Sequence, residues 1–162
     1  MANKLTVSEI LLNLFKVAFG DQFRLYRVGD PITPGQSMLP AIFVTETNLP
    51  IEQDATGYDE LTHNIFIQVV YNKKVEMGRP TEGNTLDTIL DNIVFGRDAT
   101  TGAYLDNTIV GVLRTNLTVS GLAVNSKITI RKGVVPRPEE MITAEAHIEA
   151  TITELQAVNN RT

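Results

Sequence analysis

The stretch MITAEAHIEATITEL, residues 141–155, alternates between apolar and polar side chains over most of its length. The apolar positions are Ile142, Ala144, Ala146, Ile148, Ala150 and Ile152, and the polar positions are Thr143, Glu145, His147, Glu149, Thr151 and Thr153. A helix would scatter the apolar residues around its circumference, whereas a strand places all of them on one face. The stretch therefore predicts a long, half-exposed antiparallel strand, in spite of its alanines.

Two other segments have the periodicity of helices. Thr6 and Glu9 form a capping box, and apolar residues at helical spacing continue from there to Gly20, which predicts a helix. The stretch TLDTILDNIV, residues 85–94, has one apolar face and predicts a second helix. Residues 104–114 are ambiguous, because their β-branched side chains suit a strand while their pattern weakly favours a helix.

Further strands complete the pattern. Residues 61–71 are largely apolar on both faces, which predicts a central strand. Shorter strands are predicted at 23–28, 41–47, 117–124 and 127–135, with Asn125-Ser126 as the turn between the last two. Loops are predicted at 29–40, 48–60, 72–84 and 97–103. Strands grouped at both ends of the chain indicate an α+β fold, a mostly antiparallel β-sheet with two or three helices packed on one face. Residues 1–162 are expected to form a single domain, with 156–162 as a flexible tail.

Composition excludes several classes of function. The chain has 162 residues, a net charge of −5 and no cysteine, so disulfides, thiol catalysis and cysteine-based zinc sites are excluded. The acidic balance lacks the clustered Lys/Arg that bind nucleic acid through its phosphates. No stretch approaches the roughly 20 apolar residues that span a membrane, and the N-terminal segment lacks a signal-peptide pattern. We expect a soluble protein made in a cytosol.

The segment GRPTEGNT, residues 78–85, is one residue away from a phosphate-binding loop. Asn84 stands where that motif requires the lysine that reaches the phosphates, and Pro80 removes an amide donor. The segment is therefore interpreted as a connection between a strand and a helix, in which Asn84 or Thr85 caps the helix. No cofactor and no small-molecule substrate are expected.

The two histidines, His63 and His147, do not complete a recognisable catalytic motif. His147 lies between Glu145 and Glu149 on the polar face of residues 141–155, and such a row more often forms a solvated or interfacial strand face than a metal site. We predict no catalytic residues and no metal ligands, and hence no enzyme. Long loops without chemistry favour partner binding, and the predicted interface residues are Glu52, Asp54, Tyr58, Lys73, Lys74, Arg79 and Glu82.

The order of these segments is similar to that of a known family. An amphipathic N-terminal helix leads to LPAIFVTETNLP (39–50), then to ELTHNIFIQVVYNKK (60–74), a short helix TLDTILDNIV (85–94) and a final strand AEAHIEATITEL (144–155). This arrangement resembles the tail terminator, or tail-completion, proteins of long-tailed bacteriophages of the lambda type. The resemblance covers most of the chain, and the chain departs from the family pattern in the region 97–116 and in its extra length after Pro136.

The resemblance implies an architectural protein of the virion. Six copies would form a ring on the tail tube, stop its polymerisation and offer the joining surface for the head. The implied partners are other copies of the chain, the tail tube protein and a head completion or connector protein, with genomic DNA passing through the lumen without specific binding. The implied location is the head-proximal end of the tail, after assembly in the host cytoplasm. Alternatives are another neck, tube or head–tail joining protein of related fold, or a non-viral α+β protein-binding module.

Overall fold

The computed structural model describes residues 5–29, 38–53, 57–72, 86–116, 125–137 and 142–158. In these ranges the helices are α1 (Val7–Phe19), a short 3-10 helix η1 (Gly20–Gln22), α2 (Leu86–Phe95) and α3 (Ile109–Asn116). The strands are β1 (Leu25–Val28), β2 (Ala41–Asn48), β3 (Ile51–Gln53), β4 (Tyr58–Asn72), β5 (Asn125–Pro136) and β6 (Ile142–Ala157). The predicted α+β class is confirmed.

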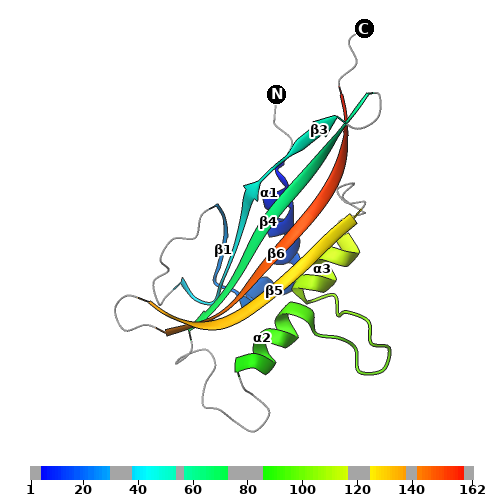
Figure 1. The fold of residues 1–162 in the computed structure, drawn as a ribbon. Coiled ribbons are helices and arrows are strands. Elements are labelled where there is room, and N and C mark those ends of the chain that lie inside the picture. The colour runs from blue at the N-terminus through cyan, green and yellow to red at the C-terminus, as the bar shows by residue number, and fades with distance from the viewer. Residues whose placement is uncertain are drawn as a thin grey trace.

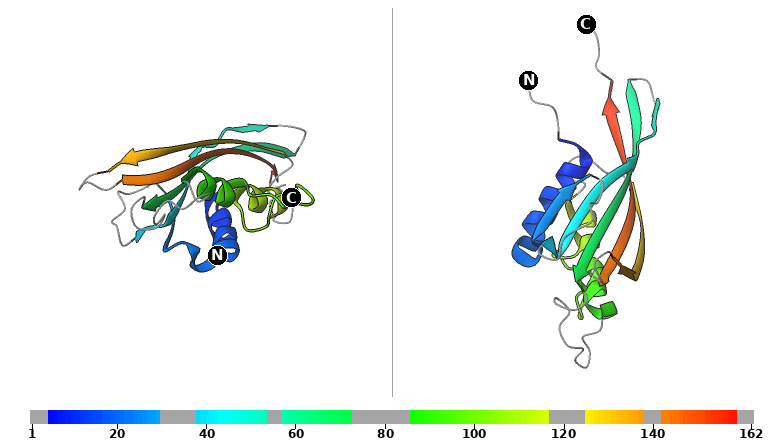
Figure 2. Two further views of the ribbon diagram at one scale, coloured as in Figure 1. Left: turned by 90° about the horizontal axis from the view of Figure 1, so that it is seen from below. Right: turned by 90° about the vertical axis from the view of Figure 1, so that its left-hand side faces the viewer.

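One twisted sheet contains all the described strands, in the order β1-β2-β4-β6-β5. The neighbouring strands are antiparallel except for β1 and β2, which are parallel. The short strand β3 pairs with the beginning of β4, on the same side of β4 as β2. The helices lie together on one face of the sheet (Figures 1 and 2), as expected. We call this face the helical face and the other the open face.

The longest ladder joins β4 to β6 and confirms both strand predictions. Tyr58 is level with Ala157 at one end, and Asn72 is level with Thr143 at the other. The odd-numbered residues of β4 and the even-numbered residues of β6 point to the helical face, where they form the main core with α1. Fully buried members of this core include Leu11, Phe15, Ile67, Ile148 and Ile152. Burying a side chain of this size contributes roughly 1.5–3 kcal/mol.

The capping box at the start of α1 forms as predicted. The Glu9 N–H donates to Thr6 Oγ1 at 3.2 Å, and the Thr6 N–H donates to Glu9 Oε2 at 3.3 Å. The two hydrogen bonds of the capping box satisfy two backbone donors at the start of the helix. The helix ends at Gly20, whose φ of 52° lies in the region that favours glycine.

The loop prediction for residues 48–60 is wrong, because β3 and the start of β4 form a hairpin there. Ile51 is level with Leu61 and Gln53 with Asp59, and Gly57 has a φ of 90° near the turn. All of β3 is exposed. None of the described helices covers either face of this hairpin, so its sequence carries no apolar alternation to mark the strand.

Residues 104–114 contain the start of a helix, in agreement with the weak preference of the pattern. Thr108 caps α3, since the Gly111 N–H donates to Thr108 Oγ1 at 2.9 Å. The β-branched residues Ile109, Val110 and Val112 are buried in the core. Tertiary packing therefore outweighs their low helix propensity.

Two boundaries at the end of the chain also differ from expectation. Asn125 and Ser126 begin β5 and do not form a turn. Residues 156 and 157 of the predicted tail belong to β6, which continues to Ala157, and the Val158 N–H donates to the Gly57 carbonyl at 2.8 Å. This part of β6 pairs with the start of β4, where Tyr58 is level with Ala157. The predicted strand at 117–124, the segment 78–85 and residues 159–162 lie outside the described residues.

Gly111 is predicted to be essential for the packing of α3. A Cβ atom at this position would lie 1.9 Å from the Leu105 carbonyl oxygen, whereas a Cβ atom at Gly133 of β5 meets nothing within 4 Å. Gly111→Ala should lower the free energy of unfolding by roughly 2–4 kcal/mol. The matched change Gly133→Ala should leave it unchanged or raise it by roughly 0.5 kcal/mol. Urea titration of both variants checks this, and equal stabilities would contradict it.

Candidate functional site

Among the described strands, β5 and β1 each pair on one side only. β5 pairs with β6 and β1 with β2, so they form opposite edges of the sheet. β5 is 12 residues long, and Lys127, Arg131 and Lys132 lie along it. An edge strand presents backbone donors and acceptors to another chain, and charged side chains limit unspecific pairing. The sheet therefore offers two edges for association, of which β5 is basic.

The β3–β4 hairpin, with the adjoining end of β6, projects past the helices (Figure 1). Large apolar side chains are exposed here: Ile51 at 58 %, Tyr58 at 47 %, Leu155 at 48 % and Val158 at 44 %. Such a cluster on a projecting element is typical of a protein contact. Two of the predicted interface residues, Glu52 and Tyr58, lie on this hairpin.

The hairpin is also acidic. Glu52 of β3 lies directly opposite Glu60 of β4, and like charges in this position destabilise a strand pair by roughly 0.2–1 kcal/mol. Both side chains point to the open face, whereas Ile51 and Asp59 point to the helical face. A cationic partner would relieve the repulsion between Glu52 and Glu60.

The other predicted interface residues fall in segments that the structure does not describe. Asp54 follows β3, and Lys73, Lys74, Arg79 and Glu82 lie between β4 and α2. Their roles stay predictions.

A groove of about 320 Å³ lies between β5 and the segment that joins α2 to α3. Apolar and aromatic residues line it, namely Phe95, Tyr104, Val110, Ile128 and Ile130, and Arg97 and Arg114 add two guanidinium groups. The wall formed by residues 97–104 is held by Asp98, whose Oδ1 accepts the N–H groups of Thr100 and Thr101 at 2.8 Å each. These two hydrogen bonds keep the pKa of Asp98 below its usual range. No sequence signal marked this groove, because its residues come from three separate segments.

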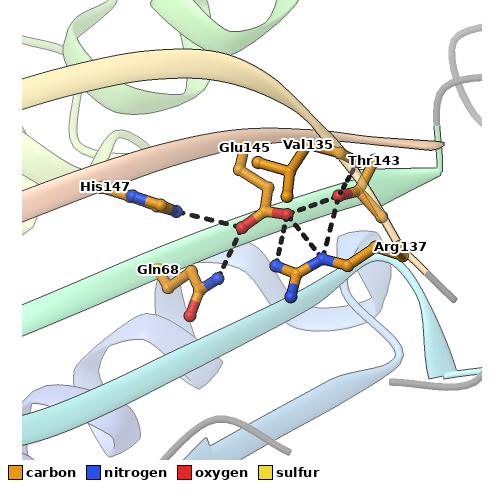
Figure 3. Close-up of polar contacts among 6 residues, drawn as sticks. All are labelled: Gln68, Val135, Arg137, Thr143, Glu145 and His147. Atoms are coloured by element: carbon orange, nitrogen blue, oxygen red, sulfur yellow. Dashed lines mark hydrogen bonds and ion pairs between the residues drawn. The ribbon is translucent and has the colours of Figure 1, made fainter. Parts of the chain in front are cut away.

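The open face also differs from the prediction at one end of β6. Glu145 was expected on an exposed polar face, but it is 1 % exposed. Its carboxylate accepts hydrogen bonds from Arg137 Nε at 3.1 Å, Gln68 Nε2 at 2.5 Å, His147 Nε2 at 3.0 Å and the Thr143 hydroxyl (Figure 3). Further along the strand Glu149 is exposed as predicted. The alternating pattern does not reveal which polar residues a neighbouring strand and Arg137 will cover.

This environment makes Glu145 a buried structural anion. Burial alone would raise the pKa of Glu145, but the hydrogen bonds from His147, Thr143, Arg137 and Gln68 outweigh it and lower the pKa from 4.5 to about 2. Because Glu145 and His147 hold each other, they are not arranged as open metal ligands. Within the described ranges, no three His, Asp or Glu side chains converge on a position that would hold a metal ion.

The depressed pKa predicts a specific loss of stability in acid. Its contribution is fully present above pH 4.5 and is lost as the pH falls from 4.5 to about 2. The size is about 3 kcal/mol, from 1.36 kcal/mol per pH unit. Glu145→Gln should remove this part of the pH dependence, while Glu149→Gln on the same strand face should keep it. Urea titrations between pH 6 and pH 2 measure the slopes, and equal slopes for wild type and Glu145→Gln would contradict the assignment.

A second buried polar cluster crosses three strands on the helical face. His63 of β4 contacts Glu46 of β2 through Nδ1 at 2.6 Å and Glu154 of β6 through Nε2 at 2.8 Å. The side chains of His63 and Glu154 are 7 % and 8 % exposed, and that of Glu46 is 29 % exposed. The sequence marked His63 only as one of two histidines.

The cluster brings one imidazole and two carboxyl groups together across β2, β4 and β6. It borders the same cavity as Thr6 and Val7 at the start of α1, where the helix dipole favours negative charge.

His63 is therefore predicted to matter more for stability than His147. His63→Ala would remove the group that joins Glu46 and Glu154 across three strands, at a cost of about 3 kcal/mol. His147→Ala should cost less than about 1 kcal/mol, because Glu145 keeps its other donors. Chemical denaturation at pH 7 compares the two variants, and a smaller loss for His63→Ala than for His147→Ala would refute this ranking.

Comparisons with known proteins add no assignment. A scan of the chain against models of protein families finds no match, and a search of curated proteins finds no relative. None of the described helices is long and apolar enough to cross a membrane. The candidate site therefore depends on geometry alone: the two edges of the sheet among the described strands, a projecting acidic hairpin and a groove with two arginines.

Proposed function

We propose that this protein is a structural component of a long-tailed phage virion, where it caps the tail tube as a hexameric ring. The ring stops tube polymerisation and provides the surface to which the head attaches. In this role the protein has no catalytic activity and binds no cofactor. The proposal starts from the sequence resemblance, and the geometry of the sheet supports it.

The observation that carries the proposal is the position of the two edges that the described strands leave. β1 and β5 end the sheet on opposite sides. A contact between unlike edges of adjacent copies is heterologous, and a heterologous contact closes into a ring when its rotation is a whole fraction of a turn. Pairing the edges across copies also covers their backbone groups. A sheet whose described strands end in two unlike edges is thus well suited to a ring.

The charge of the chain is compatible with a channel for DNA. Each copy carries −5, and a mildly acidic lumen repels the phosphates of the passing DNA, so the DNA does not adhere. The same property fits another neck or tube protein, which is the main alternative. A non-viral binding module would share the sheet but would not recognise tail tubes.

A pair of proline substitutions tests the use of the β5 edge. Arg131 and Lys132 are neighbours with exposed side chains, and successive amides along a strand point to opposite sides. One amide of the two therefore points away from β6, and proline is tolerated at that position in an edge strand. We expect one of Arg131→Pro and Lys132→Pro to unfold near the wild-type temperature and yet to fail to cap tubes.

The measurement is electron microscopy of purified tail tube protein that polymerises with and without the chain. Wild-type protein should bind one tube end as a ring and limit tube length, and the well-folded proline variant should do neither. Tubes that grow to the same length in the presence of wild-type protein would rule out the capping function. Capping by the well-folded proline variant would rule out the role of the β5 edge.

A further inference from the structure

We propose that the β3–β4 hairpin of one copy docks along β5 and into the adjacent groove of a neighbouring copy. This inference rests on the proposed ring, and it names the hairpin as the part of the β1 side of the sheet that would meet β5 of the next copy. The hairpin lies on the β1–β2 side of the sheet and β5 lies at the opposite edge. In Figure 1 and in the right-hand view of Figure 2 the hairpin and the groove region around α3 are far apart, so one chain cannot make the contact with itself.

On the helical face the two surfaces match in polarity. Ile51 of the hairpin is 58 % exposed, and the groove offers an apolar floor that includes Ile128 and Ile130. Asp59 points to the same side as Ile51, and Arg97 and Arg114 line the groove. An apolar anchor and a carboxylate would thus meet an apolar floor and two guanidinium groups.

On the open face the hairpin and β5 are complementary in charge. Glu52 and Glu60 lie opposite each other on the hairpin. On β5, Lys127 and Arg131 point to the same open face, since they are level with Thr151 and His147 of β6. Both of these β5 side chains are exposed. Docking would place two cations beside two carboxylates that repel each other in the single chain, which favours this partner over an uncharged one.

The strand registers set the offset between the copies. Ile51 of β3 is level with Leu61 of β4, which is level with Glu154 of β6. At the other edge, Ile130 of β5 is level with Ile148 of β6. Docking Ile51 near Ile130 shifts adjacent sheets along the strands by six positions, roughly 20 Å at about 3.3 Å per residue. A stagger of this kind is required when sheets close into a barrel-like ring with tilted strands.

Cross-linking between two engineered cysteines tests the contact directly. The chain has no cysteine, so an Ile51→Cys chain mixed with a Tyr104→Cys chain can be joined by a short bis-maleimide only through these positions. We expect a covalent dimer at a yield at least tenfold above that of the control mixture of Ile51→Cys with Val17→Cys. Val17 is 87 % exposed on α1, and it lies outside both surfaces. A yield equal to the control overturns the proposal.

Charge reversal shows whether the contact is specific. The yield should fall at least tenfold when the Ile51→Cys chain also carries Glu52→Lys and Glu60→Lys. It should fall equally when the Tyr104→Cys chain also carries Lys127→Glu and Arg131→Glu. Combining both pairs should restore it. Lys16→Glu with Arg24→Glu on the Tyr104→Cys chain changes net charge equally on residues outside both surfaces, and it should leave the yield unchanged. Thermal unfolding confirms that each chain is folded, and failure of the combined variants to restore the yield overturns the proposal.

Adding the cysteine-bearing chains to the tube-capping experiment distinguishes a failure of this inference from a failure of the proposed function. Tube capping by wild-type protein without an Ile51–Tyr104 cross-link would leave the ring in place and reject the hairpin contact. A cross-link without tube capping would support the contact and reject the role in tails.

Discussion

The pairing of β4 with β6 is the constraint on which the remaining structure depends. The two strands stay in register from Tyr58–Ala157 to Asn72–Thr143. Because side chains alternate across a strand, a shift of one residue would turn the apolar set of β6 away from α1 and expose it. The register therefore decides which face becomes the core, where α1 packs, and which side chains of the hairpin point to each side.

Buried polar groups reinforce this register. His63 reaches Glu46 and Glu154 only when β2, β4 and β6 are aligned as observed, and Gln68 of β4 reaches Glu145 of β6 in the same way. A shifted register would leave buried carboxylates without donors, which is costly. These contacts thus add specificity to the alignment that burial of apolar side chains already favours.

The same ladder positions the surfaces proposed to meet in a ring. It extends past the helices at one end, where it supports the exposed hairpin, and it carries β5 along its other side. Since β4 and β6 are continuous through the sheet, the acidic hairpin and the basic edge strand belong to one sheet. Their opposite charges and opposite positions are the basis of the proposed head-to-tail contact between copies.

Local pattern in the sequence was sufficient where burial on one face leaves a periodic signal. It correctly predicted α1 with its capping box, α2, the central strand β4 and the alternating strand β6, and hence the α+β class. It failed at β3 and at the start of β4, where none of the described helices covers either face and no alternation arises. It also predicted an exposed Glu145, because a polar position in an alternating strand looks the same whether it is solvated or held by Arg137.

The candidate site was predictable only in part. The sequence by itself determined the acidic balance, the absence of thiol chemistry and the polar character of the region that contains Glu52 and Tyr58. Only the tertiary structure decided that Glu52 opposes Glu60, that His63 joins two carboxylates, and that Arg97 and Arg114 share a groove with Ile128 and Ile130. The physical reason is that these contacts join residues far apart in the chain, and their distances are set by strand register and helix packing.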